Sequence, residues 1–118
     1  MLIGLINFDL YLPMVSSLKE KRSIIKSLIE KSRNKFNLSV SETGDNDLWK
    51  KANISAVTVS NERKYIDSTI SKYVNFVDEI VEVELRDYKV EIFWIDGGKL
   101  CLKYWLLRMR KKLLELWN

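Results

Sequence analysis

The order in which hydrophobic periodicity changes along this chain constrains its fold more than any other feature. Residues 2–12 alternate at period two, which predicts a strand with one buried face, and Pro13 ends this strand. Residues 18–36 instead place their apolar side chains on one side at helical spacing. Both patterns recur, and the expected elements are strand 2–12, helix 18–36, strands within 37–43 and 48–61, helix 62–80 and strand 88–95.

This order of elements predicts an α+β fold of the ferredoxin-like βαββαβ type. Such a fold has a four-stranded antiparallel sheet with two helices on one face. A length of 118 residues fits one domain, which we place at residues 1–96. Residues 97–118 form a C-terminal amphipathic extension, for which we expect a helix from about Leu102. Because an Asp-Gly pair is also a hairpin signal, a fifth strand starting over Lys99 to Lys103 stays open as the alternative.

Positive charge is concentrated in two segments of the chain. Residues 17–37 hold seven Lys or Arg and two Asp or Glu, a net charge of +5. Residues 97–118 also carry +5, whereas the remainder of the chain carries −6. This segregation creates a directional field, which favours an anionic partner more than the overall charge of +4 suggests.

The first helix combines a start signal with a row of basic side chains. Ser17 and Glu20 match a capping box, in which the serine accepts a backbone hydrogen bond and the glutamate reaches back. Four basic residues separated by three, four and seven positions then fall within about 60° of one another, and we call them the basic ridge. The ridge can follow RNA phosphates without sequence choice, and the alternative is a plain solvated face. The ridge is Lys19, Arg22, Lys26 and Arg33, and the lesser phosphate-binding candidates on the other flank are Lys21 and Lys35.

The C-terminal extension pairs a large apolar side with a basic back. An exposed stripe of this size would be an aggregation hazard for a soluble monomer. We therefore expect it to cover the open sheet face of its own domain or to pair with a second copy in a homodimer. Contact with an anionic membrane surface and contact with RNA are the other interpretations, and we favour neither. The predicted interaction helix uses Leu102, Trp105, Leu106, Met109, Leu113, Leu116 and Trp117.

Two absences disfavour an enzyme. The chain has no histidine, so neither a Ser-His or Cys-His nucleophile pair nor a His-based zinc site can be built. Its four glycines match neither a dinucleotide-binding fingerprint nor a P-loop. We expect no catalytic residues, no cofactor, no metal and no small-molecule substrate. Cys101 is the single cysteine, so an internal disulfide is excluded and a cytoplasmic location is the default.

The polar stretch before the third strand raises two lesser possibilities. Glu42, Asp45 and Asp47 are clustered carboxylates of the kind that holds Mg²⁺, but they lack calcium-loop spacing and Asp is an ordinary turn residue. Trp49 follows, and we expect it to be a packing anchor rather than a stacking platform. The aromatic pattern of RNA-recognition sheets is missing, so we expect recognition of RNA backbone or shape rather than of base sequence.

Four short motifs together resemble a known family. They are SLKEKRS at 17–23, RNKFNLSVSE at 33–42, DLW at 47–49 and VSNER at 59–63. In this order and at this spacing they are similar to the YlxP-like family, small bacterial proteins of unassigned function, over roughly residues 1–95. The resemblance implies a ferredoxin-like fold and no catalytic residues. It also implies a ribosome-linked role, because members are typically encoded among translation-initiation and ribosome-assembly genes.

Charge division and family resemblance together lead to one functional expectation. We expect a non-enzymatic cytoplasmic protein that binds ribosomal RNA or a ribosomal subunit through the basic ridge. The alternative is a protein-interaction or self-assembly module that uses the C-terminal apolar helix, with the ridge serving only solubility.

Overall fold

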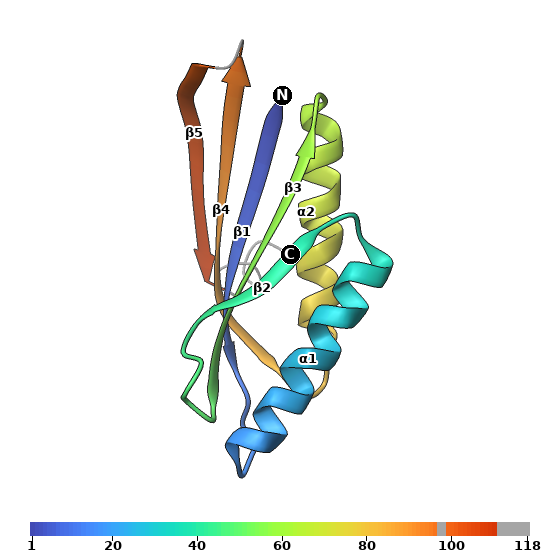
Figure 1. The fold of residues 1–118 in the computed structure, drawn as a ribbon, viewed down its shortest axis with the longest axis vertical. Coiled ribbons are helices and arrows are strands. Elements are labelled where there is room, and N and C mark those ends of the chain that lie inside the picture. Colours follow the sequence, from blue (N-terminus) through green and yellow to red (C-terminus); the bar gives the residue numbers. More distant parts are fainter. Residues whose placement is uncertain (97–98, 111–118) are drawn as a thin grey trace.

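The computed structural model describes the backbone of residues 1–96 and 99–110 and the side chains of residues 1–95. All the elements expected within residues 1–96 are present (Figure 1). None of the helices in the described part of the chain is long and apolar enough to cross a membrane. The elements are β1 (Leu2–Tyr11), α1 (Leu18–Lys35), β2 (Ser39–Gly44), β3 (Lys51–Ser60), α2 (Arg63–Asp78), β4 (Glu84–Asp96) and β5 (Lys99–Arg110).

The first strand is the centre of the sheet. β1 pairs antiparallel with β3 on one side and with β4 on the other, in the strand order β2-β3-β1-β4-β5 (Figure 1). In this register Ile6 lies opposite Ala56 of β3 and Val90 of β4. The order of the first four strands and the two helices is that of the ferredoxin-like fold, which confirms the predicted α+β class.

The predicted C-terminal helix is wrong for the part of the extension that the structure describes. Lys99–Arg110 is strand β5, which pairs antiparallel with β4 from Asp96 to Asp87. The alternative of a fifth strand is therefore the one observed. The run of twelve residues holds eight apolar or aromatic and four basic residues, and this mixture does not separate a helix from a strand. The outer edge of β4 offers backbone groups that a hairpin partner satisfies. Of the predicted interaction residues, Leu102, Trp105, Leu106 and Met109 belong to β5, whereas Leu113, Leu116 and Trp117 lie outside the described residues.

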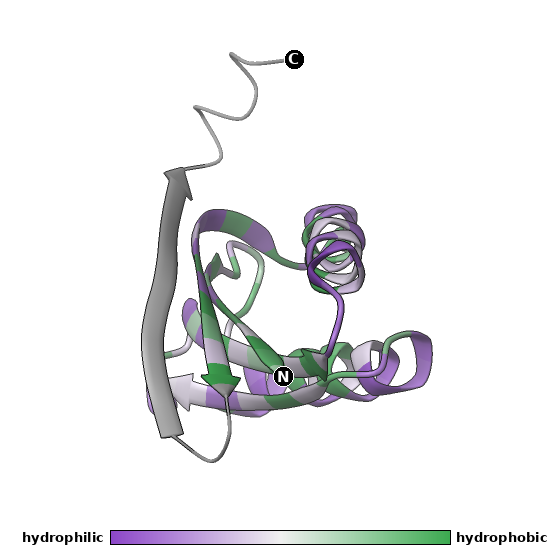
Figure 2. Ribbon diagram, turned by 90° about the horizontal axis from the view of Figure 1, so that it is seen from above, coloured by the Kyte–Doolittle hydropathy of each residue, from purple (hydrophilic) through white to green (hydrophobic). Residues whose placement is uncertain are grey.

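The core lies between the sheet and the two helices. Every second residue of β1 from Gly4 onward is buried, as the alternation predicts. Phe8 packs edge-on against Tyr73 of α2, with ring centroids 5.4 Å apart. A Cβ at Gly4 would lie 2.7 Å from Ile66 Cγ2, so glycine lets α2 approach β1 closely. Hydrophilic residues lie on the parts of both helices that are away from the sheet (Figure 2).

The start of α1 follows its sequence signal with one difference. The Ser17 side chain accepts a hydrogen bond from Glu20 N at 3.1 Å, as predicted. The Glu20 carboxylate reaches back to Ser16, accepting from its backbone N at 2.7 Å and from its Oγ at 2.8 Å. These two hydrogen bonds, with the backbone one the stronger, hold the pKa of Glu20 below its ordinary value.

A buried hydrogen bond joins the two helices. Tyr73 OH donates to Ser32 Oγ of α1 at 3.0 Å, and Ser32 Oγ donates to the Leu28 carbonyl at 2.7 Å. Burial raises the pKa of the Tyr73 phenol, and the hydrogen bond to Ser32 offsets part of that rise.

We predict that Tyr73→Phe lowers the free energy of unfolding at neutral pH by about 1 to 2 kcal/mol, because the bond to Ser32 is lost. The pKa is raised in the folded state, so the contribution of Tyr73 is complete below the unfolded pKa of about 10 and is lost as pH rises through the folded value. The difference in free energy of unfolding between wild type and Tyr73→Phe should therefore become smaller above about pH 10. Urea unfolding from pH 7 to 11 measures it, and a constant difference would contradict the assignment.

Candidate nucleic-acid interface

Three members of the basic ridge are fully available on the surface of α1. Lys19, Arg22 and Lys26 are exposed, and in the part of the chain with described side chains none of them takes part in an ion pair. Arg33 is also exposed but is tethered, because its Nη2 donates to the Val40 carbonyl of β2 at 2.9 Å. This contact shows that the ridge lies on the side of α1 that faces β2.

The ridge extends along one flank of a single helix, with Glu30 beside it between Lys26 and Arg33. From Lys19 to Arg33 it covers about 21 Å at the helical rise per residue. Its basic groups meet no described carboxylate partner, so their charge remains hydrated and open to an external anion.

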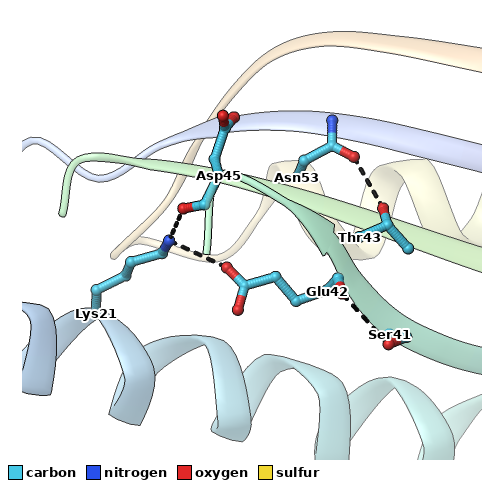
Figure 3. A network of polar contacts seen from close by, with 6 residues as sticks. All are labelled: Lys21, Ser41, Glu42, Thr43, Asp45 and Asn53. Atoms are coloured by element: carbon cyan, nitrogen blue, oxygen red, sulfur yellow. Dashed lines mark hydrogen bonds and ion pairs between the residues drawn. The ribbon is translucent and has the colours of Figure 1, made fainter. Parts of the chain in front are cut away.

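Lys21 was expected to be a lesser phosphate ligand, and this prediction is wrong. Its side chain has 0% exposure, and its Nζ lies 3.0 Å from Glu42 Oε2. The same amine donates a short hydrogen bond to the Asp45 carbonyl (Figure 3). The residue lies on the buried side of α1, where a charge is retained only if it is paired and hydrogen-bonded, so it cannot reach an external phosphate.

Lys35, the other lesser candidate, is placed differently. It is exposed, and its Nζ lies 5.8 Å from the Phe36 ring centroid and 5.1 Å from that of Phe76. It therefore packs over two aromatic rings on the last turn of α1 while staying accessible to solvent.

The turn between β2 and β3 is held by several backbone contacts. The Asp45 carbonyl accepts from Leu48 N at 3.0 Å as well as from Lys21, and Asp45 has a positive φ of 59°. The Lys50 carbonyl accepts from Leu12 N at 2.8 Å. An αL backbone is one that Asp and Asn tolerate better than most residues, which fits the polar composition of this turn.

One expectation about this turn changes. Trp49 is 52% exposed, so the predicted packing anchor is wrong. Glu42 is paired with Lys21, and the described residues contain no group of three or more acidic or other ligating side chains that could hold a metal ion.

A groove opens beside this turn on the sheet face away from the helices. Its volume is about 540 Å³. The Arg86 guanidinium lies 4.4 Å from the Tyr11 ring centroid and pairs with Glu84 at 3.2 Å. The groove is lined by Asp9, Leu10, Tyr11, Asp45, Leu48, Lys51, Ala52 and Arg86.

A second polar cluster, which sequence reasoning missed, crosses the open sheet face. Asn7 Nδ2 donates to Asn53 Oδ1 and to Ser55 Oγ, each at 2.7 Å. Asn53 Nδ2 donates in return to Asn7 Oδ1 at 3.0 Å and to Asp9 Oδ1 at 2.8 Å. Thr43 Oγ1 completes the set with a bond of 2.9 Å to Asn53 Oδ1 (Figure 3). We call these five residues the polar belt; the signal for it was the pair of polar residues inside the apolar first strand.

We predict that Lys21→Ala lowers the free energy of unfolding by about 3 to 5 kcal/mol, because Glu42 keeps a partly buried charge without a partner. The double variant Lys21→Met with Glu42→Leu removes both charges and should recover much of that loss. Urea denaturation of wild type, single and double variants gives the comparison. A loss below about 1 kcal/mol for Lys21→Ala would mean that the buried pair does not matter for stability.

Comparison with known proteins places the chain in a family. The family described as "Protein of unknown function (DUF503)" matches residues 3–90, which span the fold from β1 into β4. The "Uncharacterized protein YlxP" of Bacillus subtilis (strain 168) is 30% identical over 92 residues, which cover 78% of this chain and 100% of that protein. The YlxP-like resemblance is thereby confirmed, and the chain belongs to the DUF503 family of proteins of unknown function.

Proposed function

We propose that this protein is a non-enzymatic, cytoplasmic RNA-binding protein whose target is ribosomal RNA or a ribosomal subunit. The observation that carries the proposal is the row of exposed cations on α1, of which Lys19, Arg22 and Lys26 have no ion-pair partner among the described side chains. The ribosomal target takes its support from the gene context that the family resemblance implies.

Phosphate binding is the chemistry that suits such a ridge. Lys and Arg that neutralise phosphates release condensed counterions, and this release supplies affinity that does not depend on base sequence. Arg22 and Arg33 add a planar fork that matches phosphate oxygens, whereas the lysines act as point charges. Arg33 already uses one terminal nitrogen on Val40, so its expected share of the phosphate contacts is smaller.

We predict that the triple variant Lys19→Ala, Arg22→Ala, Lys26→Ala binds ribosomal RNA more weakly and with less salt dependence. Loss of three phosphate contacts should reduce the slope of log affinity against log salt by about 2 to 3. The measurement is a salt titration of binding to purified ribosomal RNA and to isolated subunits.

A matched control removes the same charge elsewhere. Lys31, Lys64 and Lys72 are exposed and lie off the ridge, so their triple alanine variant has the same net charge as the ridge variant. Its affinity should stay close to that of wild type. The proposal fails if wild type does not bind RNA at low salt, or if the control loses as much affinity as the ridge variant.

A second candidate function, self-assembly or protein interaction through the C-terminal segment, is favoured by one observation. β5 is the last strand of the sheet and pairs only with β4 among the described strands. A strand of 12 residues at a sheet edge offers backbone groups to which another strand can add.

Sedimentation of the full chain against a chain ending at Ile95 separates the two functions. A chain of that length is reasonable, because 92 residues of this sequence cover the whole of YlxP. Under the RNA-binding proposal both chains are monomers and the shorter one keeps most of its RNA affinity, because the ridge is intact. A dimer that depends on residues 96–118, with no RNA affinity in either chain, would favour self-assembly instead.

A further inference from the structure

The turn between β2 and β3 presents a half-exposed aromatic side chain. Trp49 is 52% exposed and its neighbour Leu48 is 49% exposed. Among the described rings, Trp49 makes no stacked or edge-on contact of the kind that joins the core aromatics. A tryptophan left half in solvent forgoes part of its hydrophobic gain and keeps ring surface open to a partner.

The backbone that carries Trp49 is anchored on both sides. Before it, the Asp45 carbonyl is fixed by the buried Lys21 amine and by Leu48 N. After it, the Lys50 carbonyl accepts from Leu12 N at 2.8 Å, and Lys51 opens β3 opposite Tyr11. The ring therefore extends from a preorganised turn, so little conformational entropy of the backbone is lost when a partner binds to it.

Two exposed cations lie directly beside the ring in the chain. Lys50 and Lys51 follow Trp49 directly and are exposed. The buried Lys21 amine donates to the Asp45 carbonyl and so fixes the turn against α1, the helix that carries the basic ridge. Asp45 and Asp47 in the same turn repel phosphate, so backbone phosphates are favoured at the flanking cations and only a base is favoured at the ring.

We infer that Trp49 stacks on an unpaired base of the RNA whose phosphates the basic ridge holds. This inference rests on the proposed RNA binding and deepens it, because it specifies single-stranded rather than duplex RNA. Aromatic rings flanked by basic side chains are the usual platform for unstacked bases, and a duplex does not expose the faces of its bases. A groove of about 540 Å³ is lined in part by Leu48 and Lys51, which flank Trp49 in the chain, and it gives space for a nucleotide adjoining the stacked base.

The test compares two tryptophans of equal exposure. Trp94 is 49% exposed and lies opposite Leu2, at the other end of the sheet from the turn, so Trp94→Ala is the matched control for Trp49→Ala. Full-length wild type, Trp49→Ala, Trp49→Phe and Trp94→Ala are titrated by fluorescence anisotropy. The probes are a labelled single-stranded oligoribonucleotide of about 12 nucleotides and the same strand annealed to its complement.

We expect Trp49→Ala to weaken binding of the single strand by about tenfold or more and to leave duplex binding unchanged. Trp49→Phe should retain most of the affinity because it keeps an aromatic face, and Trp94→Ala should behave as wild type. With 5-fluorotryptophan in the chain, the ¹⁹F resonance assigned to Trp49 should shift when the single strand is added, and that of Trp94 should not.

Several outcomes would overturn the inference. Equal losses for Trp49→Ala and Trp94→Ala, equal losses on single strand and duplex, or an unmoved Trp49 resonance each exclude stacking. If the duplex still binds through the ridge while Trp49→Ala leaves the single strand unaffected, only this inference fails. If wild type binds neither probe at low salt, the proposed function fails with it, and the exposed ring would instead indicate a protein partner.

Discussion

A buried ammonium group connects the two elements on which the proposed interface depends. Moving a charged amine out of water costs several kcal/mol, so Lys21 is stable at 0% exposure only because Glu42 supplies the opposite charge and Asp45 a carbonyl. Both partners lie on β2 and its following turn. A shift of α1 along the sheet would separate the amine from the carboxylate and leave two unpaired charges with little access to water, which would lower the stability of the fold. The register between helix and turn is therefore fixed by electrostatics as well as by packing.

That contact was not predicted, although the sequence holds a signal for it. Lys21, Ile25, Leu28 and Ser32 are spaced by four, three and four residues, and all four are buried on one side of α1. Hydrophobic periodicity ignored Lys21 and Ser32 because it counts only apolar residues. Lys21 pairs with the distant Glu42, and the Ser32 hydroxyl, which donates locally to Leu28, also accepts from the distant Tyr73. Partners so distant in sequence become visible only once the fold is known. The apolar residues of this buried side, Ile25 and Leu28, were predicted because burial of apolar area needs no specific partner.

The six elements of the ferredoxin-like unit were predictable because several independent signals agree at each of them. In β1 every second residue from Gly4 to Leu10 is buried, and Pro13 follows soon after the strand ends. The C-terminal run lacks that agreement: its apolar content fits a helix and a strand alike. What decides it is the pairing with β4, a strand of 13 residues whose outer edge would otherwise be unpaired, and local periodicity contains no information about that edge.

The two polar clusters of this domain differ in a way that bears on where an RNA can bind. In the polar belt, most donors and acceptors of Asn7, Asn53 and Thr43 already form hydrogen bonds within the belt. A ligand that bound there would have to break these bonds and form equivalent ones. Of the ridge cations, Lys19, Arg22 and Lys26 have no ion-pair partner among the described side chains, so a phosphate that arrives there displaces only water and counterions. Binding on the helix side thus gains counterion release without breaking protein contacts. RNA-recognition sheets work the other way, through exposed aromatics on the strands. In this fold the exposed Trp49 lies on a turn, and the buried Lys21 contact holds that turn against α1, the helix that carries the ridge.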